Sequence, residues 1–254
     1  ATFFNLTKIV FLSYGTEVGS AGHITIPAPL TDPKLQPSLE ENISQERDIF
    51  LIYAETVDCC HPIRRVLYDE LHSSTGRDLC GPSCLVHRRV RAGDPKQLVE
   101  SQWSHGLKSM TNTDFDSAMR RALFCPVTPG DISYRLKFYH AILAGCIPVV
   151  FEFPSFWSGK TSWWKEYGAP YELSVPFPED VNYNFVVRVP CTDDYATASR
   201  NLLLILRGMP DQEVRARQEE MMRSQQHLAY DWEGSRPDAF TAIMQRVLDF
   251  VQER

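Results

Sequence analysis

The sequence has no apolar run long enough to cross a bilayer, which takes about 18 residues or more. The first residues, Ala1-Thr2-Phe3-Phe4, contain neither an initiator methionine nor a basic segment, so they do not resemble a secretory signal peptide. We therefore expect the chain to be a processed or excised piece, with any membrane anchor lying outside it.

Positively charged residues are also fewer than negatively charged ones. The 254 residues carry 26 Lys and Arg against 32 Asp and Glu, a formal net charge of −6. This balance argues against a general nucleic-acid binder, which needs a basic surface. The hydrophobic share of 43% and the charged share of 23% are ordinary for globular proteins and allow one large domain or two modest ones.

The seven cysteines do not by themselves settle the redox compartment. Cys125 and Cys146 lie in apolar segments, and we expect both to be small core residues. A second group combines cysteine with histidine: Cys59, Cys60, His61, Cys80, Cys84 and His87. Its spacings fit no standard zinc module. In a luminal protein the expected alternative is a disulfide from the 59–60 pair to Cys80 or Cys84.

Short apolar segments alternate with amphipathic ones. We expect strands at about 23–27, 48–55, 85–90, 122–127, 147–152 and 185–189. Helices are expected at about 62–73, 95–107, 114–121, 193–207, 211–227 and 236–252, and a loop at 74–84. This alternation predicts an α/β fold with a mainly parallel sheet flanked by helices, in which ligands bind beyond the carboxyl ends of the strands.

The turn at 128–133 follows one of these strand ends and leads into a short basic helix. A strand-to-helix turn is an anion site, because free backbone N–H groups and the helix dipole point at one spot. Gly130 allows close backbone approach, and Arg135 and Lys137 carry charge that suits a diphosphate. The turn has neither the GxGxxG nor the P-loop spacing, so an ordinary βαβ turn with a solvated basic face is the alternative.

The run FCPVTPGDISYRLKFYHAILAGCIPVVFE (124–152) resembles the signature of the exostosin family of glycosyltransferases. Residues 175–183 resemble the family's Leu-Pro-Phe segment. Residues 48–54, followed by His61-Pro62-Ile63-Arg64, resemble its strand and its Arg-containing helix start. The three blocks occur in the family's order, and the resemblance covers roughly residues 20–230.

This resemblance implies a GT-B arrangement of two Rossmann-like domains, one for the acceptor and one for the nucleotide sugar. We expect residues 1–45 to be a remnant of the acceptor domain with a linker, and 46–254 to be the donor domain. The implied reaction transfers a sugar with inversion from a nucleotide sugar, in this family type a UDP-sugar, to a glycan acceptor. No catalytic base is assigned.

The resemblance also implies a donor site. Its candidate residues are Gly130, Asp131, Ser133, Arg135, Lys137, His140, Glu152 and Arg64. Counted back from Ala141, the family's usual Arg falls on Lys137 and its usual acid on His140. Three of these residues have an alternative structural role. His140 either binds ribose or phosphate or is a packed helix residue, and Glu152 either contacts the sugar or caps a loop. Arg64 either reaches the nucleotide or forms a surface salt bridge.

No cofactor and no metal are expected, since no carboxylate pair lies beside the turn and cationic side chains replace a bound ion in this family type. Asp193-Asp194 is instead expected to begin a helix. An aromatic loop at 151–167 can stack on a sugar or a base, or belong to the core or an interface.

The family suggests a Golgi-lumen, type II membrane protein, and the sequons at Asn5 and Asn42 are compatible with a secretory route. Lys137 and His140 depart from the family pattern. They therefore support a second hypothesis, in which the chain is a non-catalytic subunit of a hetero- or homodimer and binds a nucleotide sugar or a partner. A different α/β enzyme that uses the same phosphate turn is a third hypothesis.

Overall fold

The structure, a computed structural model, describes eleven parts of the chain. They are residues 11–13, 23–25, 27, 46–57, 61–88, 112–129, 136–152, 175–192, 194–231, 234 and 237–252. Everything below refers to these residues. The predicted helix at 95–107 and most of the predicted aromatic loop lie outside them, and the predicted domain division at 45/46 stays a prediction.

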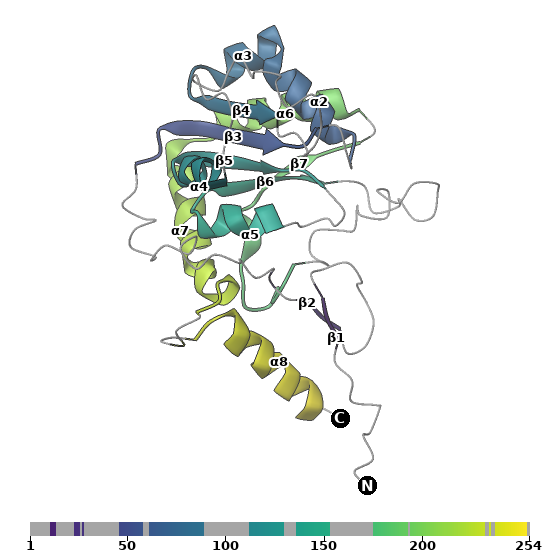
Figure 1. Cartoon of the computed structure of the whole chain (residues 1–254), viewed down its shortest axis with the longest axis vertical. Helices are drawn as coiled ribbons and strands as arrows, with labels where there is room; N and C mark the ends of the chain where they lie inside the picture. Colours follow the sequence, from purple (N-terminus) through teal and green to yellow (C-terminus); the bar gives the residue numbers. More distant parts are fainter. Residues whose placement is uncertain are drawn as a thin grey trace.

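A five-stranded sheet in the order β4-β3-β5-β6-β7 organises the fold, and every neighbouring pair is parallel (Figure 1). Its strands are β3 (Ile49–Glu55), β4 (Cys84–Arg88), β5 (Ala122–Val127), β6 (Ile147–Glu152) and β7 (Val187–Pro190). A separate parallel pair joins β1 (Phe11–Ser13) and β2 (His23–Thr25). The main sheet, with its flanking helices, confirms the predicted Rossmann-like α/β fold.

Both faces of the sheet are covered, as a parallel sheet requires. Strand β3 shows this directly: Leu51 and Tyr53 belong to one buried cluster, and Ile52 and Ala54 to another. Successive side chains point to opposite faces, so the clusters mark two layers. The helices are α2 (Ile63–His72), α3 (Ser74–Cys80), α4 (Asn112–Arg120), α5 (Leu136–Leu143), α6 (Tyr195–Gly208), α7 (Asp211–Leu228) and α8 (Ala239–Gln252), with the short 3-10 helix η5 (Tyr183–Phe185).

Helices α2, α3 and α6 pack against one another, and the buried side chains of α2 and α6 join the cluster of Leu51 and Tyr53. Helix α4 adds Phe115 and Met119 to the opposite cluster. Helix α7 packs on α5 and η5 and leads to α8 at the lower end of Figure 1. The helices after β3 and β7 therefore cover one face, and α4, which lies between β4 and β5, covers the other.

The predicted loop at 74–84 is wrong for its first half, which forms α3. Two local signals explain the helix. The Ser73 hydroxyl accepts a hydrogen bond from the backbone N–H of Gly76 at 2.9 Å and so caps the first turn. Gly81 ends the helix with φ of +64°, a conformation that favours glycine.

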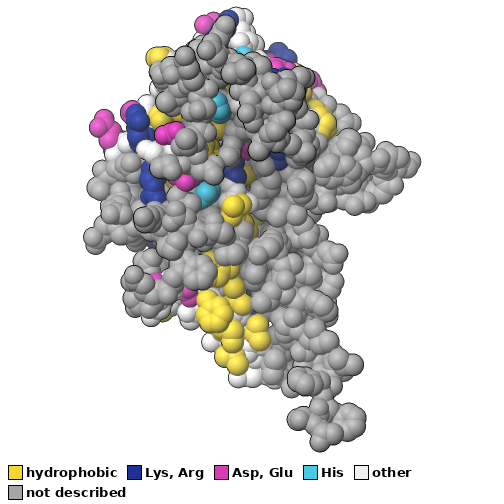
Figure 2. All heavy atoms as spheres, in the orientation of Figure 1, with side chains coloured by type: hydrophobic (Ala, Val, Ile, Leu, Met, Phe, Trp, Pro, Cys, Tyr) yellow, Lys and Arg dark blue, Asp and Glu magenta, His cyan; other side chains and the backbone are white. Residues whose placement is uncertain are grey.

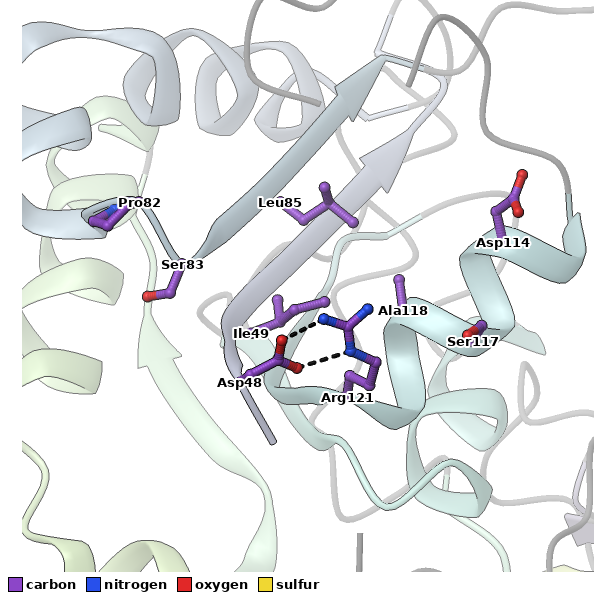
Figure 3. A pocket seen from close by; sticks show the side chains of 9 residues that line it. All are labelled: Asp48, Ile49, Pro82, Ser83, Leu85, Asp114, Ser117, Ala118 and Arg121. Carbon is purple, nitrogen blue, oxygen red and sulfur yellow. Dashed lines mark hydrogen bonds and ion pairs between the residues drawn. The ribbon is translucent and has the colours of Figure 1, made fainter. Parts of the chain in front are cut away.

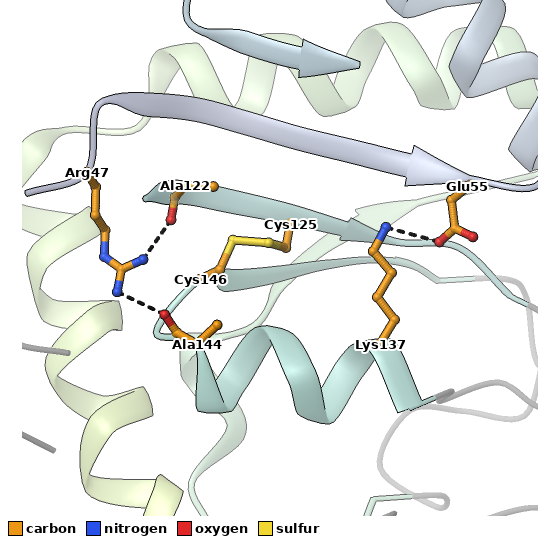
Figure 4. The surroundings of a disulfide bond; sticks show 7 residues. All are labelled: Arg47, Glu55, Ala122, Cys125, Lys137, Ala144 and Cys146. Atoms are coloured by element: carbon orange, nitrogen blue, oxygen red, sulfur yellow. Dashed lines mark hydrogen bonds and ion pairs between the residues drawn. A yellow bond between two sulfur atoms is a disulfide. The ribbon is translucent and has the colours of Figure 1, made fainter. Parts of the chain in front are cut away.

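The cysteine predictions also need correction, because two disulfides join the residues Cys80–Cys84 and Cys125–Cys146. The first connects the end of α3 to the start of β4 across a turn, so these cysteines pair with each other rather than with the 59–60 pair, and they are not zinc ligands. The second links β5 to Cys146, the residue just before β6, within the core, where the two Cα atoms lie 5.8 Å apart (Figure 4).

Arg47 ties together the amino-terminal side of the sheet. Its guanidinium donates to the carbonyls of Ala122 at 2.9 Å and Ala144 at 3.1 Å, which lie next to the starts of β5 and β6 (Figure 4). Burial, with a smaller effect of the charge on Arg120, lowers the pKa of Arg47 to about 10. One side chain thus joins the chain before β3 to the starts of β5 and β6.

Among the described helices, none is long and apolar enough to cross a membrane. Helix α8 nevertheless carries exposed apolar side chains at helical spacing, Phe240, Met244 and Leu248. Figure 2 shows hydrophobic side chains gathered on the lower part of the molecule, where α8 lies in Figure 1.

Candidate functional site

The order of the strands marks one place where a ligand crevice is expected. Strand β4 lies on one side of β3, and β5, the next strand along the chain, lies on the other. The chain therefore changes direction across the sheet between β3 and β5. In open parallel sheets, ligands bind beyond the carboxyl ends of the strands at such a switch point. Here those ends are Glu55 on β3 and Val127 on β5.

Arg64 lies at this switch point, in the first turn of α2. Its side chain is 2% exposed. Nε donates to the carbonyl of Pro129 at 2.8 Å, and Nη1 donates to the carbonyl of Thr56 at 3.4 Å. Arg64 therefore connects the chain after β3 with the first part of the turn after β5. Its charge is buried at the edge of the sheet where the sequence predicts an anion.

Lys137, in the first turn of α5, reaches the same carboxyl edge of the sheet from the helix that follows β5. Its Nζ lies 3.0 Å from Oε1 of Glu55, the last residue of β3, and the two side chains are 9% and 5% exposed (Figure 4). The ammonium also lies 5.3 Å from the centre of the Tyr53 ring and 5.6 Å from that of Phe115. The structure thus places Arg64 and Lys137 at the same end of β3, on the neighbouring residues Thr56 and Glu55, although 73 positions separate the two cations in the sequence.

Glu55 is the site residue that the sequence reasoning missed. The available signal was an acidic residue directly after the apolar run of β3, at a strand's carboxyl end. Glu55 and Lys137 form an ion pair at this edge, where the guanidinium of Arg64 is also buried. Cationic side chains at the carboxyl ends of strands are suited to an anionic ligand.

His140 and Glu152 lie apart from this pair. His140 is one turn further along α5, and burial, followed by the charges of Arg120 and Lys137, lowers the pKa of its imidazole. Glu152 ends β6, on the far side of β5 from β3, and its Oε1 accepts from Arg188 Nη1 at 3.3 Å. Both stay predictions as donor contacts.

The remaining predicted contacts, Gly130, Asp131, Ser133 and Arg135, lie outside the described residues. Their neighbours on either side are described. Thr128 is buried after β5, and α5 begins at Leu136. The ends of the signature turn are therefore anchored at the switch point, beside Arg64 and Lys137.

His61 adds a neutral group to the same side of the sheet. It is 3% exposed, and its Nδ1 accepts a hydrogen bond from the backbone N–H of Ile63 at 3.2 Å. Burial, with a further contribution from the charge on Arg64, lowers the pKa of this histidine to about 4. The imidazole is therefore uncharged at neutral pH and serves as an acceptor at the start of α2.

An Asp-x-Asp triplet, Asp114-Phe115-Asp116, also escaped the sequence reasoning. It lies in α4, where residues two apart do not face each other, so the helix does not present both carboxylates to one ion. Among the described residues, no group of three or more His, Cys, Asp or Glu side chains is arranged to hold a metal.

A cavity of about 540 Å³ lies toward the other end of the strands (Figure 3). Asp48 and Arg121 form a two-bonded ion pair there, beside the starts of β3 and β5. Ser83, before β4, also lines it, and Asp114 contributes a carboxylate from α4. Of the predicted donor contacts that the structure describes, none lines this cavity, which lies beside the starts of β3 and β4 rather than at their carboxyl ends.

Comparison with known families identifies the family of this chain. The family model described as the exostosin GT47 domain matches residues 10–200, about three quarters of the sequence. A comparison with curated proteins found no match.

Proposed function

Because the chain belongs to the exostosin GT47 family of glycosyltransferases, we propose that it binds the nucleotide-sugar donor at the switch point between β3 and β5. A family of glycosyltransferases implies a sugar donor and an acceptor as substrates. The finer proposal is that the diphosphate of a UDP-sugar lies against the turn after β5, and that the sugar passes with inversion to a glycan acceptor.

One observation carries this proposal: two buried cations from separate helices contact the carboxyl edge of the sheet, Arg64 through the Thr56 and Pro129 carbonyls and Lys137 through Glu55. Departure of a nucleoside diphosphate develops negative charge on its phosphate oxygens, and fixed cations stabilise that charge without further reorganisation. Arg64 also holds the Pro129 carbonyl, so it orients the turn as well as supplying charge. Arg135, on the same turn, is the third proposed cation.

We further propose that donor binding needs no divalent metal, since side-chain cations face the diphosphate. In the proposed GT-B arrangement, the base that takes the acceptor's proton comes from the opposite side of a cleft, and no described residue is assigned that role. The two disulfides favour an oxidising compartment. We therefore propose the Golgi lumen, with any anchor outside residues 1–254.

The alternative is a non-catalytic subunit that binds a nucleotide sugar or a partner chain. The Glu55–Lys137 pair favours it, because Glu55 compensates one of the charges available to a diphosphate. Release of nucleoside diphosphate from a donor in the presence of glycan acceptors distinguishes the two functions: an enzyme releases it, and a binding subunit only retains the donor.

Thermal unfolding with added nucleoside diphosphates tests the donor site. A ligand present at about 100 times its Kd adds about 2.7 kcal/mol to the free energy of unfolding, which raises Tm by several degrees in a protein of this size. We expect UDP to give this shift with and without a chelator, and Arg135→Ala combined with Lys137→Ala to abolish it.

Arg65→Ala is the matched control. Arg65 neighbours Arg64, but its side chain is 42% exposed and pairs with Asp69 of α2 at 4.0 Å, so its loss should leave the shift unchanged. The absence of any shift at millimolar nucleoside diphosphate would contradict the donor site. Loss of binding in chelator alone would contradict metal independence and direct attention to Asp131 and Glu152.

A further inference from the structure

A buried ion pair lies at the proposed donor site and connects β3 with α5, of which only α5 belongs to the signature motif. Glu55 is the last residue of β3, and Lys137 lies in the first turn of α5, 82 positions later. Both side chains are less than 10% exposed, and the Nζ–Oε1 distance is 3.0 Å. The pair therefore crosses the carboxyl ends of β3 and β5 at the switch point.

The surroundings of the ammonium restrict where it can lie. A lysine side chain has a flexible four-carbon stem, so its charge has no fixed position unless its partners hold it. Here Tyr53 and Phe115 place ring faces or edges within about 6 Å of Nζ, and Glu55 supplies the opposite charge. Of these groups, only the carboxylate both compensates the charge and directs an N–H bond.

We propose that Glu55 is a positioning residue, which fixes the Lys137 ammonium where the donor's diphosphate binds without itself contacting the donor. This inference rests on the proposed donor site. It gives the buried carboxylate at an anion site a role, because Glu55 lies 3.0 Å from the ammonium and removing one member of a buried ion pair is costly.

The sign of the effect separates positioning from simple charge. A carboxylate near a diphosphate repels it, so charge alone predicts that Glu55→Gln binds UDP more tightly. Positioning predicts the opposite. We expect the Kd for UDP, measured by titration calorimetry, to rise about tenfold in Glu55→Gln, which corresponds to about 1.4 kcal/mol. In a Lys137→Met background, Glu55→Gln should change the Kd no further.

Two more variants keep the test decisive. Glu55→Asp keeps the charge but shortens the side chain, so it should also weaken UDP binding, and it provides the same test if Glu55→Gln does not fold. Glu70→Gln is the control. Glu70 pairs with Arg200 at 3.7 Å between α2 and α6, away from the switch point, so the Kd should not change.

The outcomes separate the two proposals. If the wild-type protein binds UDP and Glu55→Gln or Glu55→Asp binds it equally or more tightly, Glu55 does not position Lys137 and the donor site stands. An undiminished effect of Glu55→Gln in the Lys137→Met background would show that Glu55 acts through another group. If the wild-type protein binds no nucleoside diphosphate, the donor site fails and the positioning role fails with it.

Discussion

Replacing Cys125 and Cys146 together by alanine is expected to lower the free energy of unfolding by about 3 kcal/mol, against about 2 kcal/mol for Cys80 and Cys84. The difference follows from the closed loops. The Cys125–Cys146 disulfide joins residues 21 positions apart, and the Cys80–Cys84 disulfide joins residues 4 positions apart. A longer closed loop removes more conformational freedom from the unfolded chain, so its loss costs more stability.

The two pairs form a matched comparison, because all four cysteines are at most 1% exposed. Each double variant therefore deletes two buried sulfur atoms and leaves a similar loss of packing, so that the difference reports on loop length. Urea unfolding at 25 °C, followed by circular dichroism, measures both variants. The wild-type protein in reductant provides a third measurement, in which both disulfides are open and no side chain is deleted.

Equal losses, or a larger loss for Cys80 and Cys84, would refute the loop-length reasoning. A full-sized loss in the alanine variants that reductant does not reproduce would assign the effect to packing instead.

Two further predictions concern stability. His61 has a pKa of about 4 in the folded protein and about 6.5 in the unfolded chain, so the unfolded chain binds the proton first as pH falls. The free energy of unfolding should therefore decrease by up to about 3 kcal/mol between about pH 6.5 and pH 4. Urea titrations of His61→Gln should show a flatter pH profile, and an unchanged profile would contradict this prediction. Arg47→Met removes the hydrogen-bond donor from the carbonyls of Ala122 and Ala144, and it should lower the free energy of unfolding in urea by about 2–4 kcal/mol. The Kd for UDP should stay unchanged, because Arg47 lies at the amino ends of the strands. Weaker UDP binding would contradict that separation.

Much of the fold could be predicted because its local signals agree with its tertiary contacts. The expected strands at 122–127 and 147–152 match β5 and β6, since continuous apolar runs between turn residues are typical of strands buried on both faces. Helix α6 begins where its N-cap was expected, and the Asp194 carboxylate accepts from the Thr197 N–H at 3.0 Å. In contrast, α3 has only seven residues and little apolar periodicity, so its cap residues were its main signal.

The disulfides and the site depended on information that the sequence does not contain locally. The pairing of Cys125 with Cys146 follows from the order of the strands, which makes β5 and β6 neighbours, whereas Cys80 and Cys84 are only four positions apart. The same holds for Glu55, whose partner becomes evident only when β3 and α5 meet at the switch point. Lys137 was recognised from its place after the strand-to-helix turn and Arg64 from the family resemblance, but their buried contacts follow from topology.

The charge at the switch point connects the two candidate functions. If Lys137 were unpaired, burial would favour its neutral form, and a neutral amine attracts a diphosphate less strongly than an ammonium does. Pairing with Glu55 keeps it charged, at the cost of a compensating negative charge. In the proposed donor site, a diphosphate would then meet the guanidinium of Arg64 and an ammonium already held in place. An enzyme benefits from this arrangement only if the ammonium is directed at the leaving group, whereas a binding subunit needs no such alignment. The direction of the change in UDP affinity in Glu55→Gln, read together with product release, therefore bears on which of the two functions the chain performs.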